Sequence, residues 1–364
     1  MKKRKWKKIG LVLGAALLAL SITGCSSSTS KSSSSAADSS TSSKKAATRK
    51  VKDMAGTEVT LPKKVDKVIN LWSANNQVQM LLSGTDQLAG TTEINKQLPW
   101  ATLVFPKLKD IPSYSPKSGG AINAEEILKA DPSVVIASDE NQIKTVRDAG
   151  ATAAFVNFRD FKGLKETVTK TGEILGGAAP KKADKFVTYF DKNLSYVQDK
   201  LKGVTDKPKV YEIQGTSPLG TDGKTSIATE WIEAAGGENA MSDVTDQNMT
   251  NVTMEQVLQA KPDVIILGTQ NAAKIKDQIE NDPDWQSVPA VANKKIYTNP
   301  IGTFLWSRYS CEEALQVLWV AQLLHPDQFK DLDMKKEVQK FYKDFYDFDL
   351  TEEQAQKMLD GQNP

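Results

Sequence analysis

Two stretches of the chain share one alternation of apolar and polar positions, at an offset of 130 residues. Residues 125–136 read EEILKADPSVVI, and residues 255–266 read EQVLQAKPDVII. Each predicts a short helix stopped by a proline and then a buried strand, because an unbroken valine and isoleucine run is typical of a parallel sheet covered on both faces. After each copy we expect a second helix and a second strand, within residues 138–156 and 269–298. The pattern therefore predicts a duplicated unit.

Apolar runs elsewhere predict more strands and helices around each copy. They are a hairpin at residues 51–61, strands at 67–71, 88–91 and 209–213, and helices at 77–82, 226–235 and 311–324. Strands that alternate with helices favour α/β lobes with mostly parallel sheets. The expected fold class is α/β, with two Rossmann-like lobes and a ligand cleft between them.

One long amphipathic segment, residues 180–201, separates the two lobes. Its apolar residues recur at steps of three, four and seven, as expected for one face of a helix. About 22 residues at roughly 1.5 Å each make a rod of roughly 33 Å, enough to lie across the back of both lobes. Because a single helix is a stiff connection, we expect only a small hinge motion on ligand binding.

The start of the chain predicts export. Residues 1–8 carry five lysines and one arginine, and residues 9–20 are apolar apart from two glycines. This is the secretory signal pattern, and about twelve residues are too few to span a bilayer of roughly 30 Å. The next residues end in ITGC at Cys25 and resemble a lipobox, where cleavage leaves a lipid-modified cysteine. We expect a signal peptide over residues 1–24 and an anchor at Cys25 on the outer face of the cytoplasmic membrane.

The rest of the chain is expected to divide into a tether and a folded body. Residues 25–50 are rich in serine, threonine, alanine and lysine, which favours a disordered tether. The body of a little over 300 residues exceeds what one core usually supports. Its expected parts are a first lobe at 51–177, the connecting helix at 178–203, and a second lobe with C-terminal helices at 204–364.

Composition narrows the possible partners. The net charge is +2 and no basic stripe appears in the body, so nucleic acid is not expected as a partner. We also predict that the protein is a monomer. With Cys25 acylated, Cys311 is the only other thiol, so no intrachain disulfide is predicted. The single histidine, His325, is expected to end a helix, and neither a protein metal site nor an intrinsic cofactor is predicted.

In open α/β sheets, ligands bind beyond the carboxyl ends of the strands, so two facing lobes would share a cleft. The loop at residues 300–309 is the strongest candidate, because aromatic rings for stacking surround Arg308. Its guanidinium is a planar, charged fork suited to carboxylate, catecholate or other oxyanion groups. The alternative is an ion pair between Arg308 and Glu312. The predicted ligand-binding residues are Trp72, Asn75, Thr92, Tyr114, Glu140, Gln214, Thr216, Phe304, Trp306, Arg308 and Tyr309.

Together these features resemble the class III solute-binding proteins of ABC importers, which serve ferric siderophores, haem, cobalamin and, in some members, molybdate. The resemblance covers nearly all of residues 51–364. Its motifs are residues 53–62 (DMAGTEVTLP), 123–136 and 231–237 (WIEAAGG), the long helix and the lipobox.

The resemblance implies a permease dimer with its ATPase as partners. It also implies that each lobe docks on one permease subunit through a carboxylate early in the helix before the proline. Glu125 and Glu255 hold that position here. The alternative is that they are ordinary solvated acids, favoured in a first turn by the helix dipole.

The expected function is capture of a ferric siderophore or related iron chelate outside the cytoplasm and its delivery to the permease. Cobalamin or another corrinoid, haem, and molybdate-type oxyanions stay open as ligands. A surface sensor or adhesin on the same scaffold is the alternative of a different class. Catalysis is not expected, because the chain lacks a Gly-x-Ser-x-Gly elbow and its one histidine has no evident catalytic partner.

Overall fold

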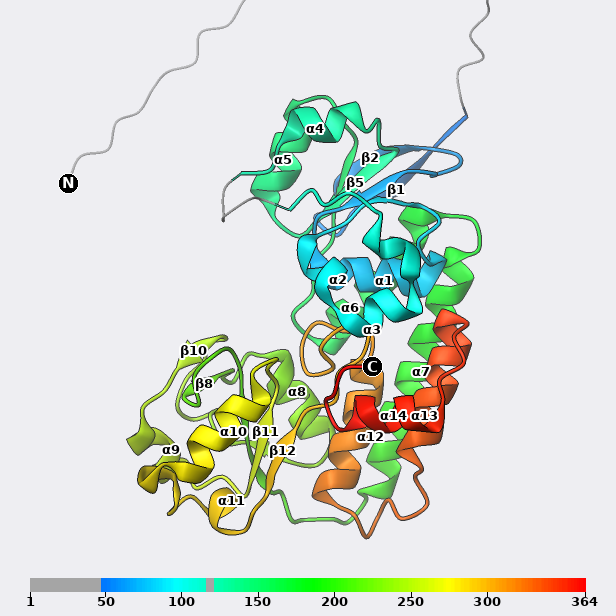
Figure 1. The fold of residues 1–364 in the computed structure, drawn as a ribbon. Helices are drawn as coiled ribbons and strands as arrows, with labels where there is room; N and C mark the ends of the chain where they lie inside the picture. Colours follow the sequence, from blue (N-terminus) through cyan, green and yellow to red (C-terminus); the bar gives the residue numbers. More distant parts are fainter. Residues whose placement is uncertain (1–46, 116–120) are drawn as a thin grey trace, which may run out of the picture. The chain divides into compact units, whose positions relative to one another are not determined.

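Strands that alternate with helices build two four-stranded parallel sheets (Figure 1). The computed structural model describes residues 47–115 and 121–364. The first sheet has the order β4 (Leu88–Gly90), β3 (Val68–Asn70), β5 (Val134–Ala137) and β6 (Ala153–Phe155). The second has the order β12 (Ile296–Thr298), β11 (Val264–Leu267), β7 (Lys209–Ile213) and β9 (Glu238–Asn239). When the first order is reversed, β6, β5, β3 and β4 correspond in turn to β12, β11, β7 and β9 of the second. The predicted α/β class with two similar lobes is therefore confirmed.

The duplicated unit forms as expected, with α4 (Ala124–Lys129), β5, α5 (Glu140–Asp148) and β6 matching α9 (Met254–Ala260), β11, α10 (Ala272–Asn281) and β12. Local chemistry explains the helix ends. The side chains of Asn123 and Thr253 each accept backbone N–H groups of the first turn. After each helix, Asp131 and Lys261 have φ near +50°, so the chain turns sharply before the proline and strand.

Two short antiparallel pairs flank the sheets. The predicted hairpin consists of β1 (Thr48–Lys52) and β2 (Glu58–Pro62), and β8 (Gly220–Thr221) pairs with β10 (Thr250–Asn251). Asp53 closes the first hairpin, because its Oδ1 accepts the N–H groups of Ala55 and Thr57. Its Oδ2 accepts from Arg147 Nη2 at 2.8 Å, which fastens the hairpin to α5.

The predicted long helix is α7 (Ala179–Lys200). It contacts α1 (Ser73–Ser83) and α6 (Phe161–Leu175) of the first lobe, and α8 (Ile227–Ala234) and α12 (Glu313–Leu324) of the second. One apolar cluster runs without a break from the first lobe along α7 to α12. Smaller clusters cover the other face of each sheet. The shared cluster explains why residues 46–364 form one compact unit although they contain two sheets.

The remaining helices lie at the lobe surfaces and at the C-terminus. They are α2 (Glu93–Gln97), α3 (Pro99–Val104), α11 (Pro289–Ala292), α13 (Met334–Phe341) and α14 (Glu352–Leu359), with 3-10 turns η1 (Pro106–Lys109) and η3 (Pro283–Trp285) and a π-helical turn η4 (Tyr342–Tyr346). The C-terminal segment, assigned from the sequence to the second lobe, also contacts the first. Trp100 Nε1 donates to the carbonyl of Gln362 at 2.8 Å, and η4 packs on α1.

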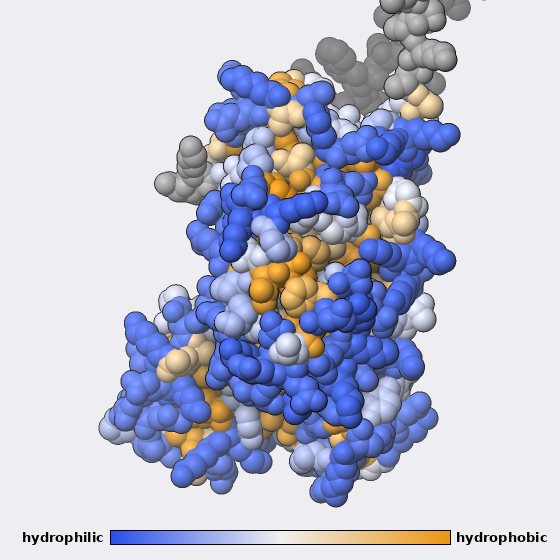
Figure 2. Space-filling view, turned by 45° about the vertical axis from the view of Figure 1, so that its right-hand side comes forward, coloured by the Kyte–Doolittle hydropathy of each residue, from blue (hydrophilic) through white to orange (hydrophobic). Residues whose placement is uncertain are grey.

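Figure 2 shows a largely hydrophilic face on which apolar residues gather near the middle. Within the residues that the structure describes, no helix combines the length and apolar character needed to cross a membrane. The predicted signal peptide, Cys25 and the predicted tether up to residue 46 lie outside the described residues. The last residues assigned to the tether are not disordered, because residues 48–50 pair with β2 as the start of β1.

Candidate functional site

A hollow of about 590 Å³, here called the interlobe hollow, lies between the two lobes. From the first lobe it is lined by Trp72, Ser138, Asn157, Phe158 and Arg159, and from the second by Thr225, Asp246, Gln247, Asn248, Met249, Arg308 and Tyr309. The first-lobe residues directly follow β3, β5 and β6. Because parallel strands end at one edge of a sheet, side chains far apart in sequence meet there.

Three aromatic rings form a row along the interlobe hollow. The ring centroids of Trp72 and Phe158 are 5.1 Å apart, and those of Phe158 and Tyr309 are 5.6 Å apart. Both pairs are inclined, as the quadrupoles of aromatic rings favour. Phe158 is almost fully buried, whereas Trp72 and Tyr309 are half-buried. The row therefore joins both lobes and keeps ring surface available for a ligand.

Arg308 lies in the interlobe hollow, but it is already paired within the protein. Its Nη1 donates to Asp222 Oδ2 at 3.1 Å, and its guanidinium carbon lies 5.0 Å from the centroid of the Tyr309 ring. Asp222, which is buried, also accepts the N–H of Met249 at 2.5 Å. Asp222 thus joins two segments of the second-lobe wall, and it takes the place of Glu312 as the ion-pair partner of Arg308.

Arg159 is the better candidate for a ligand contact, and the sequence analysis missed it. Its side chain is exposed and forms no ion pair with another described residue. Among the described residues, only Arg147 and Arg308 are arginines in ion pairs. The sequence did contain a signal for Arg159, because residues 157–159 directly follow a predicted strand. Ligands of open α/β sheets bind beyond the carboxyl ends of the strands. Residues 246–249 carried no such signal, since they belong to a loop before the short strand β10.

Of the predicted ligand residues, the structure brings Trp72, Arg308 and Tyr309 together, and it buries several others. Asn75, Thr92, Gln214 and Trp306 are at most 5 % exposed. Helix α1 begins at Ser73, four residues before the predicted start. As a result Asn75 lies inside the lobe, where its Oδ1 accepts from Thr171 Oγ1 at 2.9 Å.

The other predicted residues lie outside the interlobe hollow. Tyr114 packs over Gly90, so closely that a Cβ there would meet the ring at 2.6 Å. Glu140 is exposed at the start of α5, and Thr216 is exposed in the turn after β7. Phe304 is half-buried and packs against the shared apolar cluster. Tyr114 and Phe304 therefore have packing contacts that the sequence pattern did not reveal.

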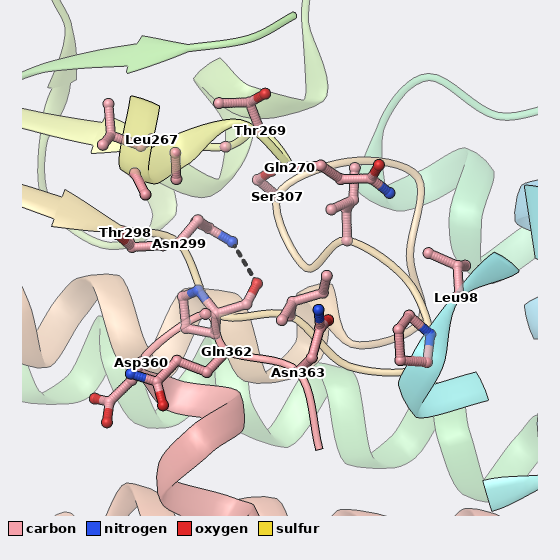
Figure 3. A pocket seen from close by; sticks show the side chains of 18 of the residues that line it. Leu98, Leu267, Thr269, Gln270, Thr298, Asn299, Ser307, Asp360, Gln362 and Asn363 are labelled. Carbon is pink, nitrogen blue, oxygen red and sulfur yellow. Dashed lines mark hydrogen bonds between the residues drawn. The ribbon is translucent and has the colours of Figure 1, made fainter. Parts of the chain in front are cut away.

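A second hollow, of about 520 Å³, lies at the carboxyl ends of β11 and β12 (Figure 3). Its walls come from residues 97–99, 267–270, 272–273, 298–301, 305, 307 and 360–363. Carboxamide and hydroxyl groups, such as the labelled Gln270, Asn299, Ser307 and Gln362, share the lining with apolar side chains. Asn299 Nδ2 donates to the carbonyl of Pro300. This hollow offers carboxamide and hydroxyl groups and one acid, Asp360, in contrast to the aromatic and cationic interlobe hollow.

Glu212 lies fully buried next to the second hollow. It accepts a short hydrogen bond from Gln214 Nε2, and a Cβ on Gly268 would lie 2.6 Å from its Oε1. Burial, with the charge of Asp222, raises the pKa of Glu212 well above its usual range. Burial therefore favours the protonated form of Glu212, and Gly268 leaves room for this carboxyl where a Cβ would collide with it.

Hydrogen bonds to Glu312, which is fully buried, hold the loop of residues 300–309 in place. One oxygen of its carboxylate accepts from Thr303 N at 3.1 Å, Thr303 Oγ1 at 3.0 Å and Tyr342 Oη at 2.5 Å. The other accepts from Phe304 N at 3.2 Å. These donors hold the start of the loop that carries Arg308.

The two predicted docking acids sit at equivalent places in the duplicated unit. Glu125 is in the first turn of α4, and Glu255 is in the first turn of α9. Both are exposed, and neither forms an ion pair with another residue of the ranges 47–115 and 121–364. His325 ends α12, as predicted, and its Nε2 lies 3.2 Å from the carbonyl of Gly236.

Two similar proteins cover most of the chain. The molybdate-binding protein MolA of Haemophilus influenzae is 25% identical in an alignment of 327 positions that covers 82% of this chain and 91% of the relative. The uncharacterized ABC transporter substrate-binding lipoprotein YvrC of Bacillus subtilis is 26% identical in an alignment of 342 positions that covers 91% of this chain and 100% of the relative.

Solved structures share the fold. A periplasmic solute-binding protein of Veillonella parvula aligns with a TM-score of 0.77 at 24% identity, over 86% of this chain and 97% of that chain. Molybdate-bound MolA of Haemophilus influenzae aligns with a TM-score of 0.74 at 23% identity, over 83% of this chain and 99% of that chain. Residues 68–300, well over half of the sequence, match the periplasmic binding protein family. The chain therefore belongs to the periplasmic binding protein family, as the sequence motifs had indicated.

Proposed function

We infer that this protein is the substrate-binding component of an ABC importer, and we propose that it captures a ferric siderophore or a related iron chelate. The observation that carries the ligand proposal is the interlobe hollow, where an aromatic row lies beside Arg159, which forms no ion pair with any residue that the structure describes. The protein acts by binding and delivery, and we propose no catalytic step.

The chemistry of the interlobe hollow favours a ligand with both flat and anionic parts. Its volume of about 590 Å³ falls in the range of roughly 300–1,000 Å³ that is usual for small-molecule sites. Trp72 and Tyr309 offer ring faces, and Arg159 offers a fork of donors for carboxylate or catecholate oxygens. The one acid in the lining, Asp246, is exposed at the rim. A chelate with acidic oxygens matches this combination.

Molybdate is the second candidate, because MolA binds it and resembles 82% of this chain. A small oxyanion would need backbone N–H and hydroxyl donors around it. The second hollow holds Thr269, Thr298 and Ser307, but it lacks an arginine or lysine. Cobalamin is a weaker alternative, since the cobalamin-binding protein of Halobacterium salinarum matches only 59% of this chain.

A titration of tryptophan fluorescence tests the ligand proposal. The body of residues 47–364 is titrated separately with ferric catecholate and ferric hydroxamate siderophores, molybdate, cobalamin and haem. Arg159→Ala is expected to weaken binding of the ferric siderophore at least tenfold. Lys162→Ala, an exposed cation three residues away and outside the interlobe hollow, is the matched control and should bind normally.

Tight binding of molybdate with no response to siderophores would refute the iron-chelate proposal and leave the transport role in place. Equal affinity of wild type and Arg159→Ala for the ferric siderophore would remove Arg159 from the site. An absence of binding to all five ligand classes would favour the sensor or adhesin alternative.

We propose that Cys25 carries the lipid anchor and holds the protein on the outer face of the cytoplasmic membrane. The name of YvrC, which resembles 91% of this chain, describes a lipoprotein. Cys25→Ser should release the protein from the membrane fraction into the medium, and retention in the membrane would contradict the proposal.

We also propose that Glu125 and Glu255 dock the protein on the two permease subunits. Their exposure and their equivalent places in the two lobes support this role. Glu125→Ala combined with Glu255→Ala should abolish uptake and leave ligand binding of the free protein intact. Normal uptake by the double variant would refute the docking role.

A further inference from the structure

Two of the exposed apolar side chains among the described residues occupy equivalent positions in the two copies of the repeat. Four large apolar residues of the described ranges stand out, namely Ile94 at 54%, Leu128 at 39%, Met249 at 67% and Leu258 at 36% exposure. Leu128 and Leu258 are separated by the same 130 residues that separate the two copies of the repeat. The two leucines are therefore equivalent residues of the two lobes.

Each of these leucines lies one helical turn after a proposed docking acid. Leu128 is three residues after Glu125 on α4, and Leu258 is three residues after Glu255 on α9. Residues three apart are neighbours on the surface of a helix. The intervening Ile127 and Val257 are almost fully buried, so the core-facing side of each helix is already occupied. Each lobe thus presents an acid beside a leucine that its own core does not use.

A single exposed leucine is ordinary on a protein surface and calls for no special cause. Exposure of the equivalent leucine in both lobes is less ordinary, because neither copy of the repeat buries it in its own core. Figure 1 places α4 and α9 in different lobes. A partner with two equivalent surfaces, each met by one lobe, gives both leucines the same role.

We propose that Leu128 and Leu258 are the apolar contacts of a duplicated docking surface, which binds the two equivalent subunits of the permease. The proposal rests on the proposed function and adds to it the residues that supply affinity. Each permease subunit then offers a basic group for the carboxylate and an apolar recess for the leucine. An apolar centre bordered by a charged contact is the usual anatomy of a protein interface.

Binding of the full chain, with its anchor, to the purified permease–ATPase complex in nanodiscs tests the proposal. Leu128→Ala and Leu258→Ala are each expected to raise the dissociation constant about five- to tenfold, by similar factors, and the double variant more than either. Ile94→Ala is the matched control, because Ile94 is more exposed and lies outside the repeat. It should bind like the wild type.

Salt concentration separates the apolar contribution from the charged one. The loss caused by the leucine variants should persist at high salt, whereas the loss caused by Glu125→Ala with Glu255→Ala should shrink. Ligand affinity and thermal stability of the leucine variants should match those of the wild type, which excludes misfolding.

Wild-type binding by the double leucine variant, together with failure of the double glutamate variant, would overturn this inference and leave the proposed function intact. Unequal effects of the two leucines by more than tenfold would also overturn it, because equivalent contacts are its premise. Failure of the wild-type protein to bind the complex would instead refute the proposed function.

Discussion

Glu312 is a buried carboxyl group whose titration we expect to change the stability of the fold. Its side chain is fully buried, and it accepts hydrogen bonds from Thr303, Phe304 and Tyr342. The substitution Glu312→Gln keeps the shape of the side chain and removes the titrating proton. The comparison of the two proteins across pH therefore isolates this one group.

The size of the effect follows from the pKa. Burial raises the pKa of Glu312 from 4.5 to about 7, although the hydrogen bonds from Tyr342, Thr303 and Phe304 lower it. Between these two values the folded protein holds a proton that the unfolded chain has released, so the free energy of unfolding falls as pH rises. The stabilisation that the raised pKa of Glu312 gives the folded protein is complete below pH 4.5 and is lost by about pH 7. At about 1.4 kcal/mol per pKa unit, the loss is about 3 kcal/mol.

Neighbouring ionisable groups do not mimic this change. Burial raises the pKa values of Tyr342 and Tyr346 well above their usual range, so both phenols stay protonated in this window. Burial likewise raises the pKa of the Cys311 thiol. Glu313, which is also buried with a raised pKa, is present in both proteins, and its titration cancels in the difference between them.

Urea denaturation of residues 47–364 at pH values from 4.5 to 8 measures the effect. The free energy of unfolding of the wild type relative to Glu312→Gln should decline by about 3 kcal/mol as pH rises to about 7, and then stay level. Glu126→Gln, which changes an exposed acid of α4, is the control and should run parallel to the wild type. Parallel curves for the wild type and Glu312→Gln would refute the assignment of a raised pKa to Glu312.

Two further substitutions test the packing described above. Gly302→Ala should lower the melting temperature and cost about 1–3 kcal/mol, because its Cβ would lie 2.4 Å from Tyr342 Oη; an unchanged melting temperature would contradict this packing. Asp53→Ala should cost about 3–5 kcal/mol in urea denaturation, since it removes the ion-pair partner of Arg147 and the acceptor of three backbone N–H groups. Lys50→Ala, which breaks an exposed pair on the same hairpin, should have little effect and is the control.

The fold was largely predictable, because periodic apolar patterns and proline stops are local signals. The duplicated unit and the long helix α7 lie within one or two residues of their predicted positions. Helix α1 shows the limit of this reading. It starts at Ser73 without a side-chain cap, so no capping residue marked its beginning in the sequence.

The candidate site was less predictable, because it depends on which polar groups pair with each other across the chain. Arg308 stood out among aromatic residues, but its partner Asp222 lies 86 residues earlier and follows a two-residue strand. Such a pairing leaves no trace in local sequence. Trp306 was predicted as a ligand contact because it belongs to the same aromatic loop, yet its ring is fully buried. Burial of an aromatic residue is decided by the fold and not by its neighbours in sequence.

The two walls of the interlobe hollow are also tied together at their base. Gln77 of α1 donates to Thr303 Oγ1 at 3.0 Å and accepts from the N–H of Cys311 at 2.7 Å, and all three residues are buried. Trp72 stands directly before α1, and Arg308 lies in the loop between Thr303 and Cys311. Parting the walls at this point would leave buried polar groups unsatisfied, at about 1–3 kcal/mol each. The base of the site therefore favours one arrangement, and any closure on a ligand is expected to come from the outer parts of the lobes and not from separation at the base.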